Sequence, residues 1–497
     1  MTKYFTPFLV LILVISPLSA KEEARKNVLI LSIDDLNDWV GCLGGHPQAA
    51  TPNIDRLARR GVLFSNAHCQ GPICGPSRAS LFSGRYPHTT GVYQQPSGDD
   101  MYLDKRLFRK SMMPEYFAAH GYSTLAAGKL LHGYPHEKTF GEYRNTGGFG
   151  PKPPNGKRLH YHLPGGLYSG TQTDWGVFPE KEEEMPDHVA ATWAEEKLGG
   201  KLEEPFFMGV GFYRPHVPFY VPEKWFEGFP LDEIELPAVR DNDLEGVPET
   251  GVRVHELPKY PDLEFLRKED DQQFLLCVQA YLACIAFVDA QVGRVLDALD
   301  GSDYADNTVV VLFSDHGYHL GEKDRVSKHS LWEESTRVPL IFSGPGIPEG
   351  ESTNKPVGLI DIYPTLLEVA GLPPKGSNEG WTLRGAWEDQ GWEWRHSVLT
   401  NYGYGNDALR SETHRYIRYE DGTEELYDME NDPNAWNNLA GLPESKRLLV
   451  EFRRELPEFV APYHPATSKK PINAWFEGHL KEHGVIEGGR KEEEKSL

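Results

Sequence analysis

The sequence predicts an α/β protein with a mostly parallel sheet covered by helices on both faces, followed by a smaller C-terminal α+β subdomain. Three observations support this prediction. Short, uninterrupted apolar runs recur between residues 27 and 370, and amphipathic segments separate them. Runs of this kind are typical of parallel strands buried between helices. After about residue 371 the sequence becomes rich in Trp, Tyr and charged residues, which indicates a separate unit.

Four apolar runs are the candidate strands, and five amphipathic segments are the candidate helices. The strand candidates are Asn27–Ile33, Ser123–Ala127, Phe206–Phe212 and Val309–Phe313. The helix candidates are Thr51–Arg60, Ser77–Phe82, Pro114–His120, His188–Leu198 and Gln272–Leu299. In the C-terminal part we expect two short strands and one helix, over Arg415–Tyr419, Leu426–Asp428 and Glu444–Phe459. The predicted domains are residues 21–370 and 371–497, and the last residues form a charged tail.

Residues 1–20 have the pattern of a secretory signal peptide. Lys3 precedes the apolar run Phe8–Ile15, and small residues lead to Ala20. The run is too short to cross a bilayer, which favours a cleaved signal over the alternative, a short membrane anchor. No later segment has about 20 apolar residues, so we expect no stable membrane span. The mature protein is therefore expected to be secreted or periplasmic.

The overall charge excludes one class of partner. The chain of 497 residues has 51 Lys and Arg against 74 Asp and Glu, a formal net charge of −23. Non-specific binding of nucleic acid needs a broad basic face, so no nucleic-acid partner is expected. A local cationic pocket for an anionic substrate remains compatible with an acidic protein.

Polar residues follow each candidate strand directly. Asp34 and Asp35 follow the first candidate strand, and Lys129 and His132 follow the second. Arg214 and His216 follow the third, and Asp315 and His316 follow the fourth. In a parallel sheet the carboxyl ends of the strands share one edge, where sites are usually found. Crowded carboxylates stay ionised only beside a cation, and oxygen ligands favour Ca²⁺ or Mg²⁺. The alternative is that Asp34 caps a helix and Asp315 begins a turn.

The stretch Cys74-Gly75-Pro76-Ser77-Arg78 is the most specific motif. Pro76 suits the first turn of a helix, so Cys74 faces the free N–H groups of a helix N-terminus. That position favours a thiolate nucleophile, with a Cys69–Cys74 disulfide as the alternative. Cys277 and Cys284 are expected to be ordinary core residues of one helix.

These residues resemble the signature of the type I sulfatases. The motif at Cys74 continues through Leu81 to Ser83-Gly84-Arg85. The resemblance covers about residues 27–440 and includes Thr51-Pro52-Asn53-Ile54-Asp55-Arg56-Leu57, Asp315-His316-Gly317, Asp361-Ile362-Tyr363-Pro364-Thr365 and Leu426-Tyr427-Asp428. The stretches most similar to the iduronate-2-sulfatase branch are Gly128-Lys129-Leu130-Leu131-His132, Arg214-Pro215-His216-Val217-Pro218 and Ser327-Lys328-His329-Ser330.

The resemblance implies an alkaline-phosphatase-like fold and a set of site residues. A maturation enzyme would convert Cys74 to Cα-formylglycine, whose hydrate is the nucleophile. The implied ligands of a Ca²⁺ ion are Asp34, Asp35, Asp315 and His316, with the formylglycine of Cys74 also touching the metal. Among the other implied residues, Arg78 and Lys129 hold the hydrate, and His132 is the base that releases sulfate. Lys129, His216 and Lys328 bind the substrate sulfate, and the last two help the alcohol leave.

The activity expected from the resemblance is hydrolysis of sulfate esters on a sulfated saccharide. One residue departs from many members of the family, which have Asn where this chain has His316, although the iduronate-2-sulfatase branch also has His. The alternatives are an arylsulfatase or choline-sulfatase, a phosphonate or phosphodiester hydrolase, and an inactive binding protein for sulfated glycans. Within the long segment 133–176, basic and aromatic residues suit a saccharide surface: Lys152, Lys157, Arg158, His160 and His162.

Overall fold

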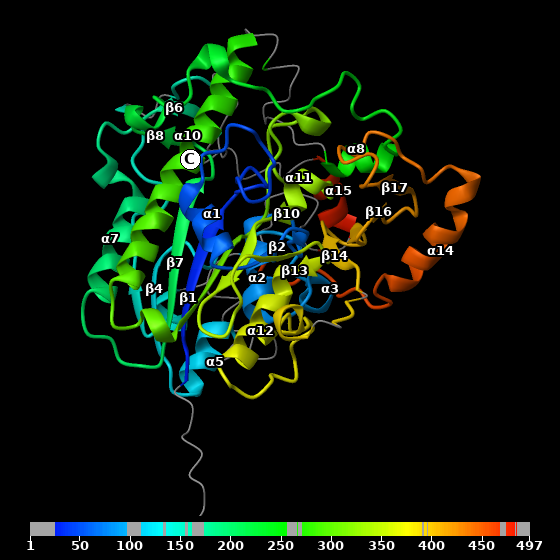
Figure 1. Ribbon diagram of the computed structural model, residues 1–497. Helices are drawn as coiled ribbons and strands as arrows, with labels where there is room; N and C mark the ends of the chain where they lie inside the picture. The colour runs from blue at the N-terminus through cyan, green and yellow to red at the C-terminus, as the bar shows by residue number, and fades with distance from the viewer. Residues whose placement is uncertain are drawn as a thin grey trace, which may run out of the picture.

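The central feature of the computed structural model is an eight-stranded sheet (Figure 1). The structure describes residues 25–96, 111–132, 136–154, 158–161, 173–255, 266, 271–389, 392–394, 396–467, 474–482 and 484. The predicted signal peptide, the charged tail, Lys157 and His162 lie outside these residues.

The sheet is mostly parallel, as predicted. Its strand order is β12 (Glu351–Thr353), β2 (Gly61–Phe64), β11 (Leu340–Ser343), β9 (Thr308–Ser314), β1 (Asn27–Asp34), β7 (Phe206–Pro215), β4 (Ser123–Gly128) and β5 (Glu142–Arg144). The last five strands of this order all run parallel, whereas β11 is antiparallel to both of its neighbours. The four predicted strands are β1, β4, β7 and β9, and they are adjacent in the centre of the sheet.

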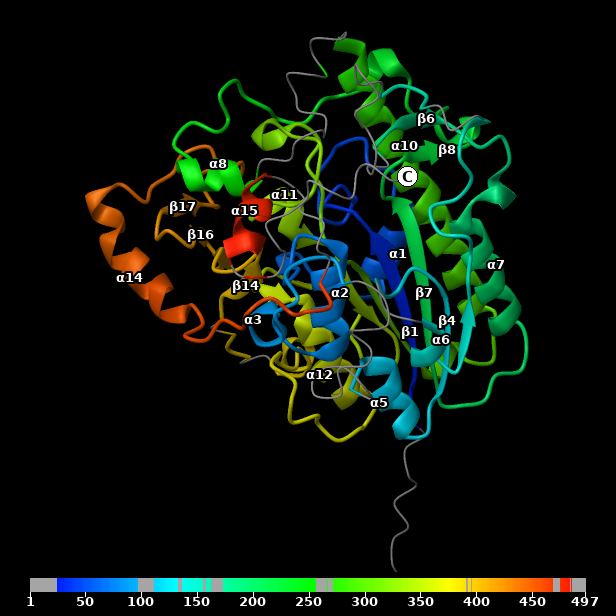
Figure 2. The same cartoon turned by 180° about the vertical axis from the view of Figure 1, so that it is seen from behind.

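The alternating side chains of β1 explain why helices cover both faces. Leu29, Leu31 and Ile33 pack into one core, and Val28 and Ile30 pack into the other. The first core is closed by α1 (Pro52–Arg59), α7 (Pro186–Leu198) and α10 (Asp271–Asp300). The second is closed by α2 (Cys74–Ser83), α5 (Met113–Ala119) and α12 (Ile362–Val369). Figures 1 and 2 show the two layers from opposite sides. A strand buried on both faces must be apolar throughout, which is the pattern seen in the sequence.

Helix α10 is long and apolar enough over residues 272–300 to span a membrane, judged by length and composition alone. In its most apolar window, 72 % of the residues are buried inside the fold. Cys277 and Cys284 on this helix are fully buried, as predicted. The composition of α10 therefore follows from its place in the core.

The C-terminal part is a four-stranded antiparallel meander. Its strands are β14 (Val398–Asn401), β15 (Asp407–Arg410), β16 (His414–Arg418) and β17 (Glu424–Asp428), with α14 (Lys446–Glu455) packed beside them (Figure 1, yellow to orange). Helix α14 is shorter than the predicted Glu444–Phe459, because Leu456 precedes Pro457 and takes an extended conformation. The predicted domain boundary at residue 370 remains a prediction.

Other short elements also lie within the described residues. The other strands there are β3 (Ala67–His68), β6 (Trp175–Val177), β8 (Phe219–Val221), β10 (Arg337–Val338) and β13 (Val357–Gly358). The other α-helices described are α3 (Pro87–Thr90), α6 (His136–Thr139), α8 (Glu249–His255), α11 (Glu333–Thr336), α13 (Gly385–Glu388) and α15 (Ala474–Glu482).

A buried ion cluster joins the C-terminal sheet to helix α11 and the segment before it. Glu333 accepts hydrogen bonds from Arg415 Nη2 at 2.6 Å and from Arg410 Nε at 3.2 Å. Arg415 also donates to the Leu331 carbonyl at 2.5 Å. Burial would raise the pKa of Glu333, but Arg410 and Arg415 outweigh it and hold that pKa well below its usual value. The stability from this carboxylate is therefore present at neutral pH and decreases as the pH falls.

We predict that Arg415→Ala destabilises the fold, because it leaves Glu333 buried with one cation fewer. Breaking a buried ion pair by removing one partner costs about 3–5 kcal/mol. Urea denaturation should give a lower free energy of unfolding for Arg415→Ala than for the parent. Arg447→Ala, which removes an exposed cation paired with Glu451, is the control and should change little. Equal stabilities for the two variants would contradict the role given to the cluster.

Candidate active site

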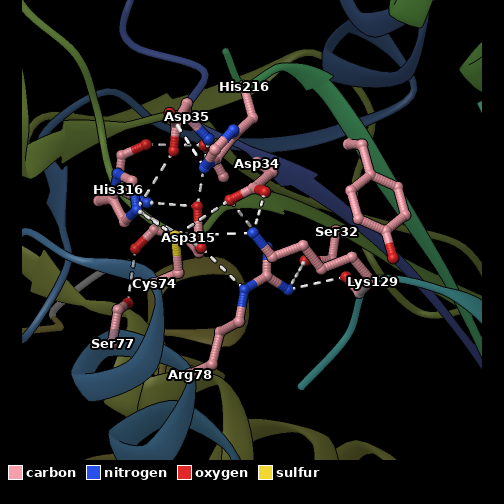
Figure 3. Close-up of polar contacts among 12 residues, drawn as sticks. Ser32, Asp34, Asp35, Cys74, Ser77, Arg78, Lys129, His216, Asp315 and His316 are labelled. Atoms are coloured by element: carbon pink, nitrogen blue, oxygen red, sulfur yellow. Dashed lines mark hydrogen bonds and ion pairs between the residues drawn. The ribbon is translucent and has the colours of Figure 1, made fainter. Parts of the chain in front are cut away.

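The predicted site residues at the strand ends converge at one edge of the sheet (Figure 3). Asp34 is the last residue of β1, and Asp315 and His316 follow β9 directly. Lys129 follows β4, and His216 follows β7. The register of β1 shifts between Ser32 and Asp34, and Asp35 has a φ of 64°. A local irregularity of this kind re-aims side chains beside a site.

Cys74 is placed at the same edge by helix α2. The helix begins at Cys74 itself, one turn earlier than the predicted Ser77–Phe82, and the preceding Ile73 is extended. The Ser77 hydroxyl donates to the Asp315 carbonyl at 2.5 Å, which ties the first turn to the end of β9. Gly75 is required here, because a Cβ atom would lie 2.3 Å from the side chains of Gln95 and Pro96. The Cys74 side chain is 1 % exposed and lies at the positive end of the helix.

Arg78, one turn further along α2, connects three strand ends. Its Nε donates to Asp315 Oδ2 at 2.8 Å, and its Nη1 donates to the Lys129 and Leu130 carbonyls at 2.8 and 2.9 Å. The same Nη1 lies 3.2 Å from the hydroxyl of Ser32 on β1. Burial would lower the pKa of Arg78, but Asp315 and Asp34 outweigh it and raise that pKa. The guanidinium is therefore charged and fixed.

Three cationic groups surround the Cys74 sulfur. His316 Nε2 lies 3.2 Å from Sγ, Lys328 Nζ 3.3 Å and Lys129 Nζ 3.6 Å. Burial alone would raise the pKa of the thiol, but these three groups hold it well below its usual value. Lys129 also pairs with Asp34, and Lys328 pairs with Asp35 at 2.7 Å. The structure thus stabilises negative charge at the position of Sγ.

Four of the predicted metal ligands fit a cation. One ligand atom from each of Asp34, Asp35, Cys74 and His316 lies within 4.8 Å of the others. Asp35 Oδ2 is buried and has no hydrogen-bond partner within the described part of the chain. His316 Nδ1 lies 3.0 Å from the Gly317 carbonyl, so Nδ1 carries a proton, and Nε2 would present its lone pair to a cation once its own proton is lost.

Asp315 is held differently from the other four ligand candidates. Its Oδ2 accepts from Arg78, and its Oδ1 accepts from the backbone N–H of Asp35 and His316 at 3.3 and 3.0 Å. It is not one of the four residues whose ligand atoms all lie within 4.8 Å of one another. Burial raises the pKa of Asp315 to about 7 although Arg78 opposes it. Asp315 lies close to Asp34 and Asp35, and the repulsion among these carboxylates would decrease if a cation bound between them.

The two predicted histidines also face this site. His216 Nδ1 lies 2.6 Å from the Val217 carbonyl, and Nε2 lies 3.9 Å from Asp35 Oδ2 (Figure 3). Burial lowers the pKa of His132, although a side-chain hydrogen bond with Cys74 opposes that shift. All the predicted site residues are thus brought together around Cys74.

The cysteine pairing considered as an alternative is not formed. The structure describes all five cysteines, and each of them is free. The Cys69 thiol instead lies 3.8 Å from the Ser335 carbonyl.

Two supporting residues were not predicted from the sequence. The Tyr281 hydroxyl on α10 donates to the Asp35 carbonyl at 2.7 Å and accepts from the Asn37 N–H at 3.1 Å. His136 Nε2 accepts from the Leu131 N–H at 3.0 Å and so holds the segment that follows Lys129. Neither residue belongs to a motif, and only the fold brings Tyr281 next to Asp35.

A separate cavity of about 470 Å³ lies beside α11 and β15. Its lining includes Asp38, Glu334, Arg337 and Arg410 but none of the predicted site residues. This cavity is therefore distinct from the site around Cys74.

Family models cover most of the chain. The model described as Sulfatase matches residues 26–372, and the model described as N-sulphoglucosamine sulphohydrolase, C-terminal, matches residues 321–461. The first match contains every predicted site residue, and the second contains the C-terminal sheet.

Relatives with sulfatase names match over most of their length. A "Sulfatase" of Formosa agariphila is 42 % identical, and the match covers 88 % of this chain and 87 % of that protein. "Iduronate 2-sulfatase" of Homo sapiens is 31 % identical, with 70 % of each chain covered.

A solved structure supports the same relationship. The structure of a 2-O GAG sulfatase aligns with a TM-score of 0.63 and 25 % identity, and covers 86 % of this chain and 90 % of its own. The fold is thus the alkaline-phosphatase-like fold that the sequence resemblance implied. With the family model matching well over half of its length, the chain belongs to the sulfatase family and is a sulfuric ester hydrolase.

Proposed function

We propose that the protein removes sulfate from a sulfated saccharide, with Cys74 converted to formylglycine and a Ca²⁺ ion bound beside it. The observation that carries the proposal is the convergence of Lys129, Lys328 and His316 on the buried Cys74 sulfur. That position suits the oxygens of a formylglycine hydrate and of the sulfate group. Two of the similar proteins have names that support a saccharide substrate, "Iduronate 2-sulfatase" and "2-O GAG sulfatase".

The ligands proposed for Ca²⁺ are Asp34, Asp35, Asp315 and His316. Oxygen-rich ligation with an open carboxylate atom at Asp35 suits a hard divalent cation. A bound Ca²⁺ would stabilise negative charge on the sulfate oxygens and offset the charge of the crowded carboxylates. Formylglycine at residue 74 would supply, as its hydrate, one hydroxyl to attack the sulfur and a second to expel the sulfate.

The surrounding side chains would bind the sulfate and move protons. Lys129 and Lys328 offer ammonium donors to the sulfate oxygens, where charge increases in the transition state. His216 donates through Nδ1 to Val217, so a proton on Nε2 makes it an imidazolium that can protonate the leaving alcohol oxygen. His216 Nε2 lies 3.9 Å from Asp35 Oδ2, on the side of the site proposed for the cation. His132, beside Cys74, is placed to take a proton from the hydrate during release of sulfate.

Maturation and export complete the proposal. Because Cys74 is buried in the folded chain, a maturation enzyme would have to oxidise it before folding is complete. Residues 1–20 would direct the protein to the periplasm or outside the cell. Sequencing the N-terminus of the exported protein tests the second point.

We predict that residue 74 of the mature protein is an aldehyde. Replacing the thiol with the aldehyde oxygen lowers the peptide mass by about 18 Da, which mass spectrometry detects. Cys74→Ala should fold and lose all turnover of sulfated saccharides. Cys69→Ala removes a second buried thiol five residues away and should remain active. An unmodified Cys74 in protein from the natural host would contradict the proposed reaction. The alternative would then be an inactive binding protein for sulfated glycans.

We predict that Lys328→Met lowers kcat by about two to three orders of magnitude, the cost of removing one preorganised donor from a transition state. The variant keeps the length of the side chain and removes its charge. Lys355→Met, which removes an exposed cation paired with Glu412, is the matched control. Equal steady-state rates for the two variants would contradict the role of Lys328.

We predict that Ca²⁺ stabilises the folded protein as well as activating it. At a free concentration 100 times its Kd, a ligand that binds only the folded state adds about 2.7 kcal/mol. Chelation should therefore lower the thermal midpoint, and added Ca²⁺ should restore it. In Asp35→Ala the midpoint should no longer respond to Ca²⁺. A response that survives in this variant would place the metal elsewhere.

A further inference from the structure

The ring of Phe149 lies against two of the residues proposed to bind sulfate. Lys129 Nζ is 5.1 Å from the centre of the ring, and the His216 ring is 4.6 Å away with an interplanar angle of 37°. Tyr213 packs against the same ring edge-on at 5.3 Å. Phe149 belongs to the long segment 133–176 and to no sequence motif. Its position follows only from the fold.

One buried guanidinium holds Phe149 and His216 in the same place. Arg214 is 1 % exposed and donates to the carbonyls of Phe149, His216 and Tyr220 at 3.3, 3.4 and 2.8 Å. Asp187 in turn accepts from the Arg214 N–H at 3.1 Å. The loop that carries Phe149 is therefore fixed to the strand end that carries His216. This arrangement gives the ring a defined position relative to a bound sulfate.

Burial limits the direction in which the alcohol part of a bound sulfate ester can extend out of this site. Cys74 is 1 % exposed, Lys129 4 % and Lys328 7 %, so the floor of the site is closed. Phe149 and His132 are partly exposed. When sulfate is bound among the lysines, the alcohol part of the ester must extend toward the partly exposed side chains. Phe149 is the apolar one of these two.

We propose that Phe149 forms the wall against which the sugar ring that carries the sulfate packs. This inference rests on the proposed function and names the part of the substrate that the site distinguishes. A pyranose ring has an apolar C–H face, and specific ligand sites combine aromatic surfaces with a few placed polar groups. The lysines and the histidine recognise the sulfate, and Phe149 selects a cyclic alcohol over a small, flexible one.

The test separates binding of the sugar from binding of the sulfate. Affinities for methyl 2-O-sulfo-α-L-iduronate and for inorganic sulfate are measured by calorimetry with Ca²⁺, in the non-reacting Cys74→Ala protein. Adding Phe149→Ala should weaken the saccharide at least tenfold and change the affinity for sulfate less than twofold. Phe149→Tyr should retain both affinities. Phe149→Leu keeps much of the volume without the aromatic face and serves if the alanine variant does not fold.

Three results would overturn the inference. These are an unchanged saccharide affinity, no saccharide binding by the Cys74→Ala protein, and an equal loss for both probes. In the last case Phe149 would act only by supporting Lys129 and His216. The proposed reaction is judged separately, from turnover of the same saccharide by the protein with an intact residue 74. Absent turnover with the expected binding pattern would refute the reaction while the role of Phe149 stands.

Discussion

The Arg78 guanidinium bonds to residues at the ends of three strands that are far apart in the sequence. It donates to Asp315 after β9, to the carbonyls that follow β4 and to Ser32 on β1. Because these acceptors are buried, removing the guanidinium would leave several of them unsatisfied, which is costly in a low-dielectric interior. The relative positions of Lys129, Asp34 and Asp315 depend on this one side chain. The motif that presents Cys74 therefore also organises the site around it.

The distribution of charge is the second constraint on the site. The chain as a whole has a formal charge of −23, yet cationic side chains converge on Cys74. The nearby acidic side chains each have a specific partner: Lys129 for Asp34, Lys328 for Asp35 and Arg78 for Asp315. The pocket can thus favour an anion although the protein surface is acidic. Asp35 Oδ2 keeps free coordination capacity, as a cation site requires.

The sequence predicted the centre of the fold more completely than its edges. Strands β1, β4, β7 and β9 are buried on both faces, so each has a continuous apolar run that marks it. The short strands β2, β11 and β12 were not predicted, because a few residues in an edge or antiparallel position leave no distinctive pattern. For the site, motifs and strand ends located the residues around Cys74. They gave no signal for Tyr281, His136 or Phe149, which reach the site only through tertiary packing.

We propose that buried carboxylates and the first turn of α2 together form one centre for a metal and a modified residue. A crystal structure of the mature protein grown with Ca²⁺ would show both groups. We expect one metal peak about 2.3–2.6 Å from oxygens of Asp34 and Asp35, with Asp315 and His316 also ligating it. We also expect oxygen, not sulfur, on the side chain of residue 74. A sulfur atom at that position, with no metal between it and Asp35, would show that no such centre exists.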